Sequence, residues 1–199
     1  MSSVHIIVAD GFADWEPGYA LAEIRRSGGL SVTTVGFTTA PVRSMGGLRV
    51  LPDMALADVQ PGDARLFMLP GGDLWEDETA YPRGELERVL WRLHESGIPI
   101  AAICGATVAV ARAGLLDDRR HTSNAKDYLT DKAREYRGAA LYEPELAVRD
   151  RGIITASGLG PVEFAREIFA ELEVFSPSDA SLWFEMFKHG RMPESHSAG

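Results

Sequence analysis

Short apolar runs alternate with segments of helical periodicity along most of the chain. Apolar, partly β-branched runs predict strands at 4–9, 30–37, 64–69, 98–103, 145–148 and 152–156. Apolar positions three and four residues apart predict helices at 19–26, 82–96, 107–113, 161–172 and 177–189, and a further short helix follows 121–124. Continuous apolar strands followed by helices are typical of parallel βαβ units, so we expect an α/β fold with helices on both faces of the sheet.

The length of 199 residues fits one domain, which we place at 1–189. The last ten residues, 190–199, have the composition of a flexible tail. Glycines and prolines scattered through 38–64 predict turns and a small hairpin. With 45% hydrophobic and 25% charged residues, the composition is that of an ordinary globular protein and excludes a wholly disordered chain.

The net charge is −9, from 20 basic and 29 acidic side chains. An acidic surface repels phosphate backbones and anionic lipids, so neither nucleic acid nor a membrane is an expected partner. The longest uncharged central run, 98–111, is shorter than a membrane-spanning helix, and no secretory signal is apparent. One cysteine excludes an intramolecular disulfide. These features favour a cytoplasmic protein.

Cys104 is the strongest candidate for chemistry. It lies between a predicted buried strand and a predicted helix, and small residues, Gly105 and Ala106, follow it. A side chain on such a sharp turn projects from the edge of the sheet. Backbone N–H groups at the start of the helix, together with the helix dipole, are expected to favour the thiolate. The alternative is a small, buried cysteine that only fills space.

Two other segments end predicted strands at the same edge of the sheet. Glu16 follows the first strand, and Gly71–Gly72 follows the third. In open α/β sheets ligands bind at this carboxyl edge, so we expect these residues to lie near Cys104. The Gly72 and Gly105 N–H groups then form a candidate oxyanion hole. Taken alone, Glu16 fits a helix start and the glycine pair fits an ordinary turn.

The histidines show no close spacing to one another or to Cys104 that suggests a metal site. Only His121 lies in a loop predicted near the same edge. Neither a GxGxxG pattern nor a P-loop is present, so no cofactor is expected. The expected ligand is a small-molecule substrate or an oxidant.

The order of these segments resembles the ThiJ/PfpI family of the class I glutamine amidotransferase-like superfamily, which includes deglycase-like and intracellular protease-like members. The matching segments cover about residues 4–172 and read VADGFADWEPGYAL, LFMLPGG, IPIAAICGATVAVARAGLL, RRHTSNAKDY and IITASGLGPVEFAREI. The resemblance implies a flavodoxin-like, doubly wound, mostly parallel sheet and a dimer or larger oligomer. It also implies that Cys104 is the nucleophile, Glu16 its carboxyl neighbour, and Gly72 and Gly105 the N–H donors.

The sequence departs from the family patterns where a general base is expected. Protease-like members carry histidine directly after the cysteine, where this chain has Gly105. Deglycase-like members carry histidine where this chain has Asn124, and His121 stands three residues earlier. Asn124 and His121 are therefore candidate accessory residues. The segment 155–161 lacks the His-x-Glu pair of glutaminases. A placed base contributes about 10²–10⁴-fold, so hydrolysis without one is expected to be slow.

Three functions are compatible with these residues. The first is a cysteine-dependent hydrolase or lyase acting on a small carbonyl or amide substrate. The second is an oxidative-stress or electrophile sensor with little turnover. The third is a catalytically weak, amidotransferase-like interaction protein. The helix at 177–189 carries Trp183, Phe184 and Phe187, which either cover the sheet or form the surface of a homodimer.

Overall fold

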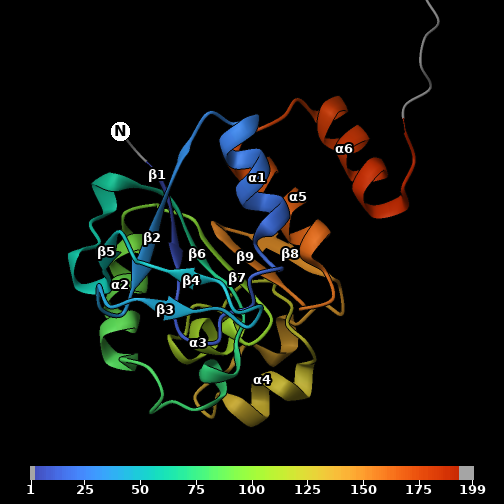
Figure 1. The fold of residues 1–199 in the computed structure, drawn as a ribbon. Coiled ribbons are helices and arrows are strands. Elements are labelled where there is room, and N and C mark those ends of the chain that lie inside the picture. Colours follow the sequence, from blue (N-terminus) through green and yellow to red (C-terminus); the bar gives the residue numbers. More distant parts are fainter. Residues whose placement is uncertain (1–2, 193–199) are drawn as a thin grey trace, which may run out of the picture.

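A seven-stranded sheet forms the centre of the computed structural model, which describes residues 3–192 (Figure 1). Across the sheet the strands are β5 (Met54–Ala55), β2 (Ser31–Gly36), β1 (Ser3–Ile7), β6 (Ala64–Leu69), β7 (Ile100–Ile103), β9 (Ile153–Ala156) and β8 (Ala147–Asp150). All neighbours pair in parallel except β8, which runs antiparallel to β9 at one edge. The predicted mostly parallel sheet is thus confirmed.

Helices cover both faces of this sheet, as the apolar strands require. One face packs against α1 (Gly18–Arg26), α5 (Pro161–Leu172) and α6 (Pro177–His189). The other face packs against α2 (Arg83–Glu95), α3 (Ala106–Arg112) and α4 (Lys126–Lys132). Alternate side chains of β6 enter the two layers, since Leu66 and Met68 join the first cluster and Phe67 and Leu69 the second. The doubly wound, flavodoxin-like arrangement follows.

Most predicted elements agree with the structure to within about two residues. The segment 38–64 forms the expected hairpin, made of β3 (Val42–Arg43) and β4 (Arg49–Val50), and also supplies edge strand β5. Four short 3₁₀ turns complete the described chain: η1 (Leu56–Asp58), η2 (Pro61–Asp63), η3 (Asp73–Glu76) and η4 (Gly138–Leu141). The strand expected at 145–148 begins two residues later, and its antiparallel direction was not foreseen.

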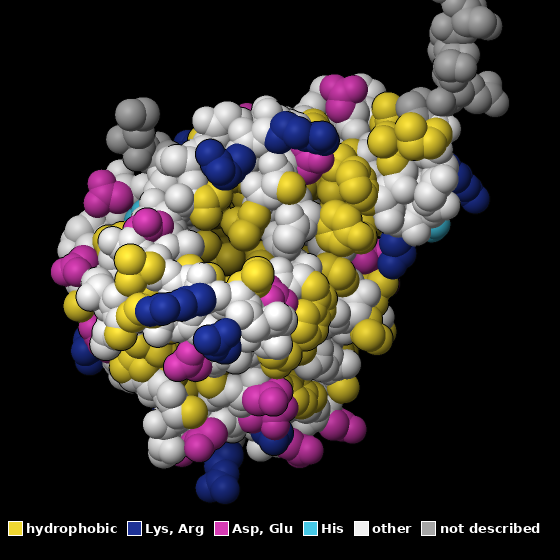
Figure 2. Space-filling model, viewed as in Figure 1, with side chains coloured by type: hydrophobic (Ala, Val, Ile, Leu, Met, Phe, Trp, Pro, Cys, Tyr) yellow, Lys and Arg dark blue, Asp and Glu magenta, His cyan; other side chains and the backbone are white. Residues whose placement is uncertain are grey.

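Of the aromatic residues of α6, Trp183 is buried and Phe187 is exposed. Trp183 is buried, its ring meets Phe169 edge-on, and its indole N–H donates a 3.2 Å hydrogen bond to Glu23 on α1. Phe187 and Trp15 remain largely exposed. Figure 2 shows hydrophobic side chains gathered on the face around α1 and α6. The helix thus both covers the core and leaves an apolar surface.

The carboxyl ends of the parallel strands bring distant segments of the chain together. The loops after β1, β6, β7 and β9 all leave the same edge of the sheet. Within residues 3–192 no helix is long and apolar enough to cross a membrane. The predicted tail at 190–199 lies, from residue 193 onward, outside the described residues.

His5 is a buried titratable group in the middle of β1. Its side chain is 2% exposed, and within residues 3–192 its Nδ1 atom has no hydrogen-bond partner. Burial lowers the pKa of His5 below its ordinary value, while the charge of Asp63 acts in the opposite direction. The folded protein therefore holds this imidazole in its neutral form.

We expect His5 to make the folded state less stable in mild acid. Below pH 6.5 the unfolded chain binds a proton at this position more readily than the folded one, so the free energy of unfolding falls as the pH falls. The limit for one group is about 1.4 kcal/mol per pH unit. The free energy of unfolding, measured with a denaturant between neutral pH and pH near 5, should depend less steeply on pH in His5→Leu than in the parent protein. His189→Gln, at an exposed position, is the control, and an equal slope in His5→Leu and the parent would contradict the expectation.

Candidate active site

Cys104 occupies the sharp turn between β7 and α3. Its φ angle of +58° lies in the left-handed region, which is uncommon for any residue except glycine and costs about 1–3 kcal/mol. The Cys104 N–H donates a 2.9 Å hydrogen bond to the Ala156 carbonyl of β9, which fixes the turn to the sheet. The side chain is half-buried. This is the geometry of a nucleophile elbow.

Glu16 lies beside this cysteine, in the loop between β1 and α1. Its side chain is 1% exposed, and its Oε2 accepts a 2.6 Å hydrogen bond from the Gly71 N–H. The carboxyl group is also hydrogen-bonded with Cys104. Burial raises the pKa of Glu16 to about 7, although both hydrogen bonds act to lower it. The carboxyl group can therefore take up or release a proton near neutral pH.

Two glycines leave just enough space for this pair. A Cβ atom added to Gly71 would lie 2.7 Å from Glu16 Oε2 and 2.8 Å from the Cys104 Cβ. A Cβ atom added to Gly158, in the loop after β9, would lie 2.9 Å from the Cys104 sulfur. Contacts this short force a neighbour to move. The thiol and the carboxyl group thus lie together between two loops that have no room for a side chain at residues 71 and 158.

Asn124 contacts the sulfur from the exposed side. Its Nδ2 donates to Cys104 Sγ at 3.4 Å, and its Oδ1 accepts a 2.9 Å hydrogen bond from the Gly158 N–H. The second bond fixes the orientation of the amide, because only the Oδ1 atom can accept. Asn124 therefore supplies a donor to the sulfur but has no basic nitrogen that can take a proton.

The protonation state of Cys104 differs from the sequence-based expectation. Burial raises the pKa of the Cys104 thiol, and the negative charge of Glu16 raises it further, while hydrogen bonds from Asn124 and the Gly105 N–H lower it. The Gly105 N–H, at the start of α3, therefore lowers this pKa by less than burial raises it. Glu16 gives up its proton near pH 7 and the thiol does so at higher pH, so the pair passes from two protons to one around neutral pH, and the two titrations are coupled.

The two proposed N–H donors lie on the loops that flank the sulfur. Gly72 has a φ angle of +155°, which side-chain-bearing residues rarely adopt. Within residues 3–192 its N–H donates no hydrogen bond to the protein. A Cβ atom on Gly105 would lie 2.9 Å from the Gly72 carbonyl oxygen. That contact explains locally why residue 105 carries no side chain.

His121 lies away from the sulfur, in the second core layer. Its Nδ1 atom donates to the Arg119 carbonyl at 2.8 Å, and its Nε2 atom accepts from the Tyr136 hydroxyl. The ring is fully buried, and burial lowers the pKa of His121. Both ring nitrogens are occupied, so the expectation of an accessory role for His121 at the cysteine is not supported.

Sequence reasoning missed two residues of this site. Gly158 follows the predicted strand at 152–156, so the sequence could have placed it at the same carboxyl edge of the sheet as Cys104. Tyr128 stands four residues after Asn124, inside α4, whereas Asn124 precedes that helix. Its hydroxyl oxygen lies 3.5 Å from the position of a Gly105 Cβ atom. Both residues therefore border the cysteine.

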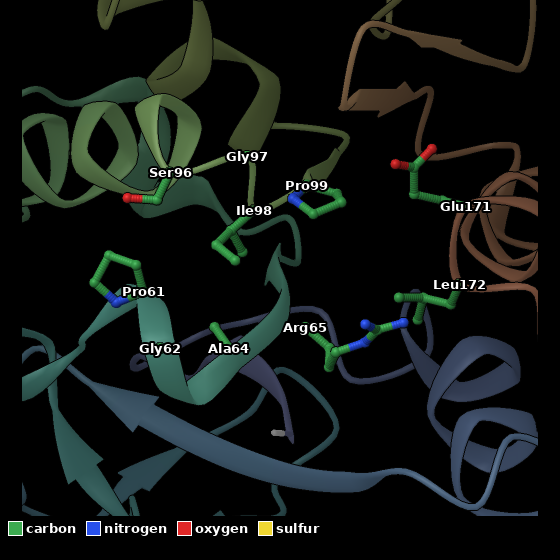
Figure 3. A pocket seen from close by; sticks show the side chains of 10 residues that line it. All are labelled: Pro61, Gly62, Ala64, Arg65, Ser96, Gly97, Ile98, Pro99, Glu171 and Leu172. Carbon is green, nitrogen blue, oxygen red and sulfur yellow. The ribbon is translucent and has the colours of Figure 1, made fainter. Parts of the chain in front are cut away.

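The described residues offer no metal centre, since none of their His, Cys, Asp and Glu side chains form a group of three or more that could hold an ion. A separate hollow of about 640 Å³ lies at the opposite, amino-terminal edge of the sheet. Figure 3 shows Arg65, Ser96 and Glu171 along its wall. It is formed at the beginnings of β6 and β7, whereas Cys104 follows the end of β7.

Comparison with known proteins relates this chain to one family. The family model described as the DJ-1/PfpI family matches residues 2–171. The Bacillus subtilis protein named "Uncharacterized protease YoaZ" is 36% identical over 195 residues, covering 93% of this chain and 90% of that protein. The Caenorhabditis elegans protein named "Glutathione-independent glyoxalase DJR-1.2" is 32% identical, covering 73% of this chain and 75% of its own.

A solved structure extends the likeness to the whole fold. The thiJ/pfpI family protein from Bacillus anthracis superimposes with a TM-score of 0.88 at 34% identity, covering 96% of this chain and 92% of that one. A TM-score this high with nearly all of both chains aligned indicates that the two proteins share one fold. The family model spans most of the sequence, and on this evidence the chain belongs to the DJ-1/PfpI family.

Proposed function

We propose that this protein is a cysteine-dependent enzyme that acts on a small carbonyl or amide substrate, with Cys104 as the nucleophile. The observation that carries the proposal is the buried Glu16 carboxyl group, with a pKa of about 7, hydrogen-bonded with a thiol on a strained turn. Perturbed titratable groups on strained backbone concentrate at functional sites. The relatives named as a glyoxalase and as a protease are both compatible with attack on a carbonyl-type carbon.

The proposed reaction begins with a proton transfer inside the pair. The Cys104 thiol gives its proton to the Glu16 carboxylate, and the thiolate attacks the carbonyl carbon, forming a carbon–sulfur bond. The π electron pair moves to the carbonyl oxygen, where the Gly72 and Gly105 N–H groups stabilise the negative charge. With an amide, Glu16 gives the proton to the nitrogen that leaves as the carbon–nitrogen bond breaks, and water then cleaves the carbon–sulfur bond of the thioester, which releases the acid and restores the thiol. With an aldehyde or ketone, Glu16 gives the proton to the oxygen, and the thiol is restored when the carbon–sulfur bond of the adduct breaks again. Asn124 keeps the sulfur oriented through its Nδ2 contact.

A second candidate function is an oxidant sensor with little turnover. It is favoured by the absence of any described histidine in hydrogen-bond contact with Cys104, which leaves Glu16 as the neighbouring group that titrates near neutral pH. A sulfinate formed on Cys104 would accept hydrogen bonds from Asn124, the Gly105 N–H and a protonated Glu16. These donors already surround the sulfur in the reduced protein.

The proposal includes a homodimer located in the cytoplasm. The dimer is supported by the exposed aromatic surface between α1 and α6, where Trp15, Tyr19 and Phe187 line one hollow and the rings of Tyr19 and Phe187 meet edge-on. Exposed apolar patches of this kind mark interaction surfaces in other proteins.

The first test is substitution of the nucleophile. Cys104→Ser and Cys104→Ala should each reduce turnover on a carbonyl or amide substrate found by screening by a factor on the order of 10⁴. Steady-state kinetics measures the loss, and circular dichroism checks that the fold is retained. Asn124→Ala, which keeps the nucleophile, should retain part of the activity. Full turnover in both cysteine variants would remove Cys104 from the reaction.

The second test concerns oxidation. Dilute peroxide should convert the Cys104 thiolate to sulfenic and then sulfinic acid, and intact mass should rise by the mass of one and then two oxygen atoms. Cys104→Ala is the control, because any rise in the mass of this variant comes from oxidation of other residues such as methionine. A thiol that stays unmodified at doses that oxidise free cysteine would rule out the sensor function.

The third test uses the space at Gly158. Gly158→Ala places a methyl group 2.9 Å from the sulfur, and overpacking of about 1–3 kcal/mol should slow alkylation of Cys104 by iodoacetamide about tenfold or more. Gly62→Ala is the matched control, because a Cβ atom there meets nothing within 4 Å. Equal alkylation rates in both variants would show that Gly158 does not confine the sulfur.

A further inference from the structure

Tyr128 places a phenol group beside the nucleophile elbow. The residue is half-buried in α4, which begins two residues after Asn124, and Asn124 contacts the sulfur. Its hydroxyl oxygen lies 3.5 Å from the position that a Gly105 Cβ atom would occupy, and a Cβ atom there would also meet the Gly72 carbonyl. The phenol thus borders the loop residues that carry both proposed N–H donors.

A network of two further side chains holds this phenol in place. The Tyr128 hydroxyl donates a 3.2 Å hydrogen bond to Oε1 of Glu76, and Lys132 Nζ lies 2.6 Å from Oε2 of the same carboxylate. Glu76 belongs to η3, directly after the Gly71–Gly72 loop, and Lys132 ends α4. The network therefore ties together the two segments that flank Cys104. At 3.2 Å the hydroxyl contact is longer than a typical O–H···O bond. Another negatively charged acceptor, such as an oxyanion, can therefore compete with the Glu76 carboxylate for the hydroxyl proton.

The charges around Tyr128 keep it a donor. Burial raises the pKa of Tyr128, and the negative charge of Glu76 raises it further. The hydrogen bond from Lys132 lowers the pKa of Glu76, so this carboxylate stays ionised. A phenol in such surroundings retains its proton throughout the physiological range and cannot serve as a base.

We propose that the Tyr128 hydroxyl donates a hydrogen bond to the substrate oxygen that becomes negative when Cys104 attacks, as a third donor beside the Gly72 and Gly105 N–H groups. In this step the carbon–sulfur bond forms, the π electron pair moves to oxygen, and the phenol keeps its proton. Glu76 and Lys132 are positioning residues for the phenol. The inference rests on the proposed function of Cys104 as a nucleophile toward carbonyl carbons.

The test compares two reactions of the same sulfur in the full-length protein. Acylation of Cys104 by p-nitrophenyl acetate passes through an oxyanion, and the released nitrophenolate reports its rate. Alkylation by iodoacetamide is a displacement at saturated carbon, in which no oxyanion forms. Tyr128→Phe should lower the acylation rate about 10- to 100-fold, near the range for loss of an oxyanion donor, and should leave the alkylation rate unchanged. The ratio of the two rates is therefore the readout.

Two variants serve as controls. Cys104→Ala gives the background acylation at other residues. Tyr142→Phe removes another half-buried phenol hydroxyl, whose 3.4 Å contact is with the Ser123 carbonyl, and should leave the ratio of rates unchanged.

The outcomes separate the two proposals. An unchanged ratio in Tyr128→Phe, or an equal fall in both rates, would overturn the role of Tyr128 while leaving Cys104 as the nucleophile. If the unsubstituted protein shows no acylation above the Cys104→Ala background, the proposed function itself fails, and the role of Tyr128 fails with it.

Discussion

The chemistry open to this site depends on one interaction, between the Cys104 thiol and the Glu16 carboxyl group. Both groups are largely removed from water, and they are hydrogen-bonded to each other. Burial disfavours the charged form of each, so the pair passes from two protons to one as Glu16 titrates near pH 7, and the thiol keeps its proton to higher pH. The reactive form is the one in which the carboxyl group carries the proton and the sulfur carries the charge. Every contact around the pair, from the Gly71 N–H to the Asn124 amide, shifts the balance between these two arrangements.

The sheet is what allows such a pair to exist. Bringing Glu16 and Cys104 together requires loops from β1 and β7, with β6 between them, to leave the same edge. The left-handed backbone at Cys104 is unfavourable by itself and persists because β7 is bonded on both sides and the Cys104 N–H is bonded to β9. The stability of the two core layers thus maintains a strained turn at the cysteine for which we propose chemistry.

The sequence predicted the parts of this arrangement that follow from local pattern and chain order. An apolar run ended by Cys104 and Gly105 indicates an elbow, and the alternation of strands and helices indicates which edge Glu16 occupies. The direction of the pKa shift at Cys104 was not predictable, since desolvation depends on loops distant in sequence. The different surroundings of Asn124 and His121, only three residues apart, were also not predictable. The side chain of Asn124 contacts the sulfur, whereas that of His121 enters the core. The role of Gly158 likewise depends on tertiary contact alone.

An amide at position 124 has a chemical consequence for the whole site. Asn124 can orient the sulfur but cannot take a proton, and the hydroxyl of Tyr128 is held in its protonated form. Any step that needs a base therefore falls to Glu16, which is occupied by the thiol proton once the thiolate has formed. Reactions in which that same proton is passed on to the substrate suit this arrangement, whereas those that must activate a separate water molecule do not. An asparagine at position 124, without a basic nitrogen, thus suits addition and elimination at a carbonyl carbon better than hydrolysis of a stable amide.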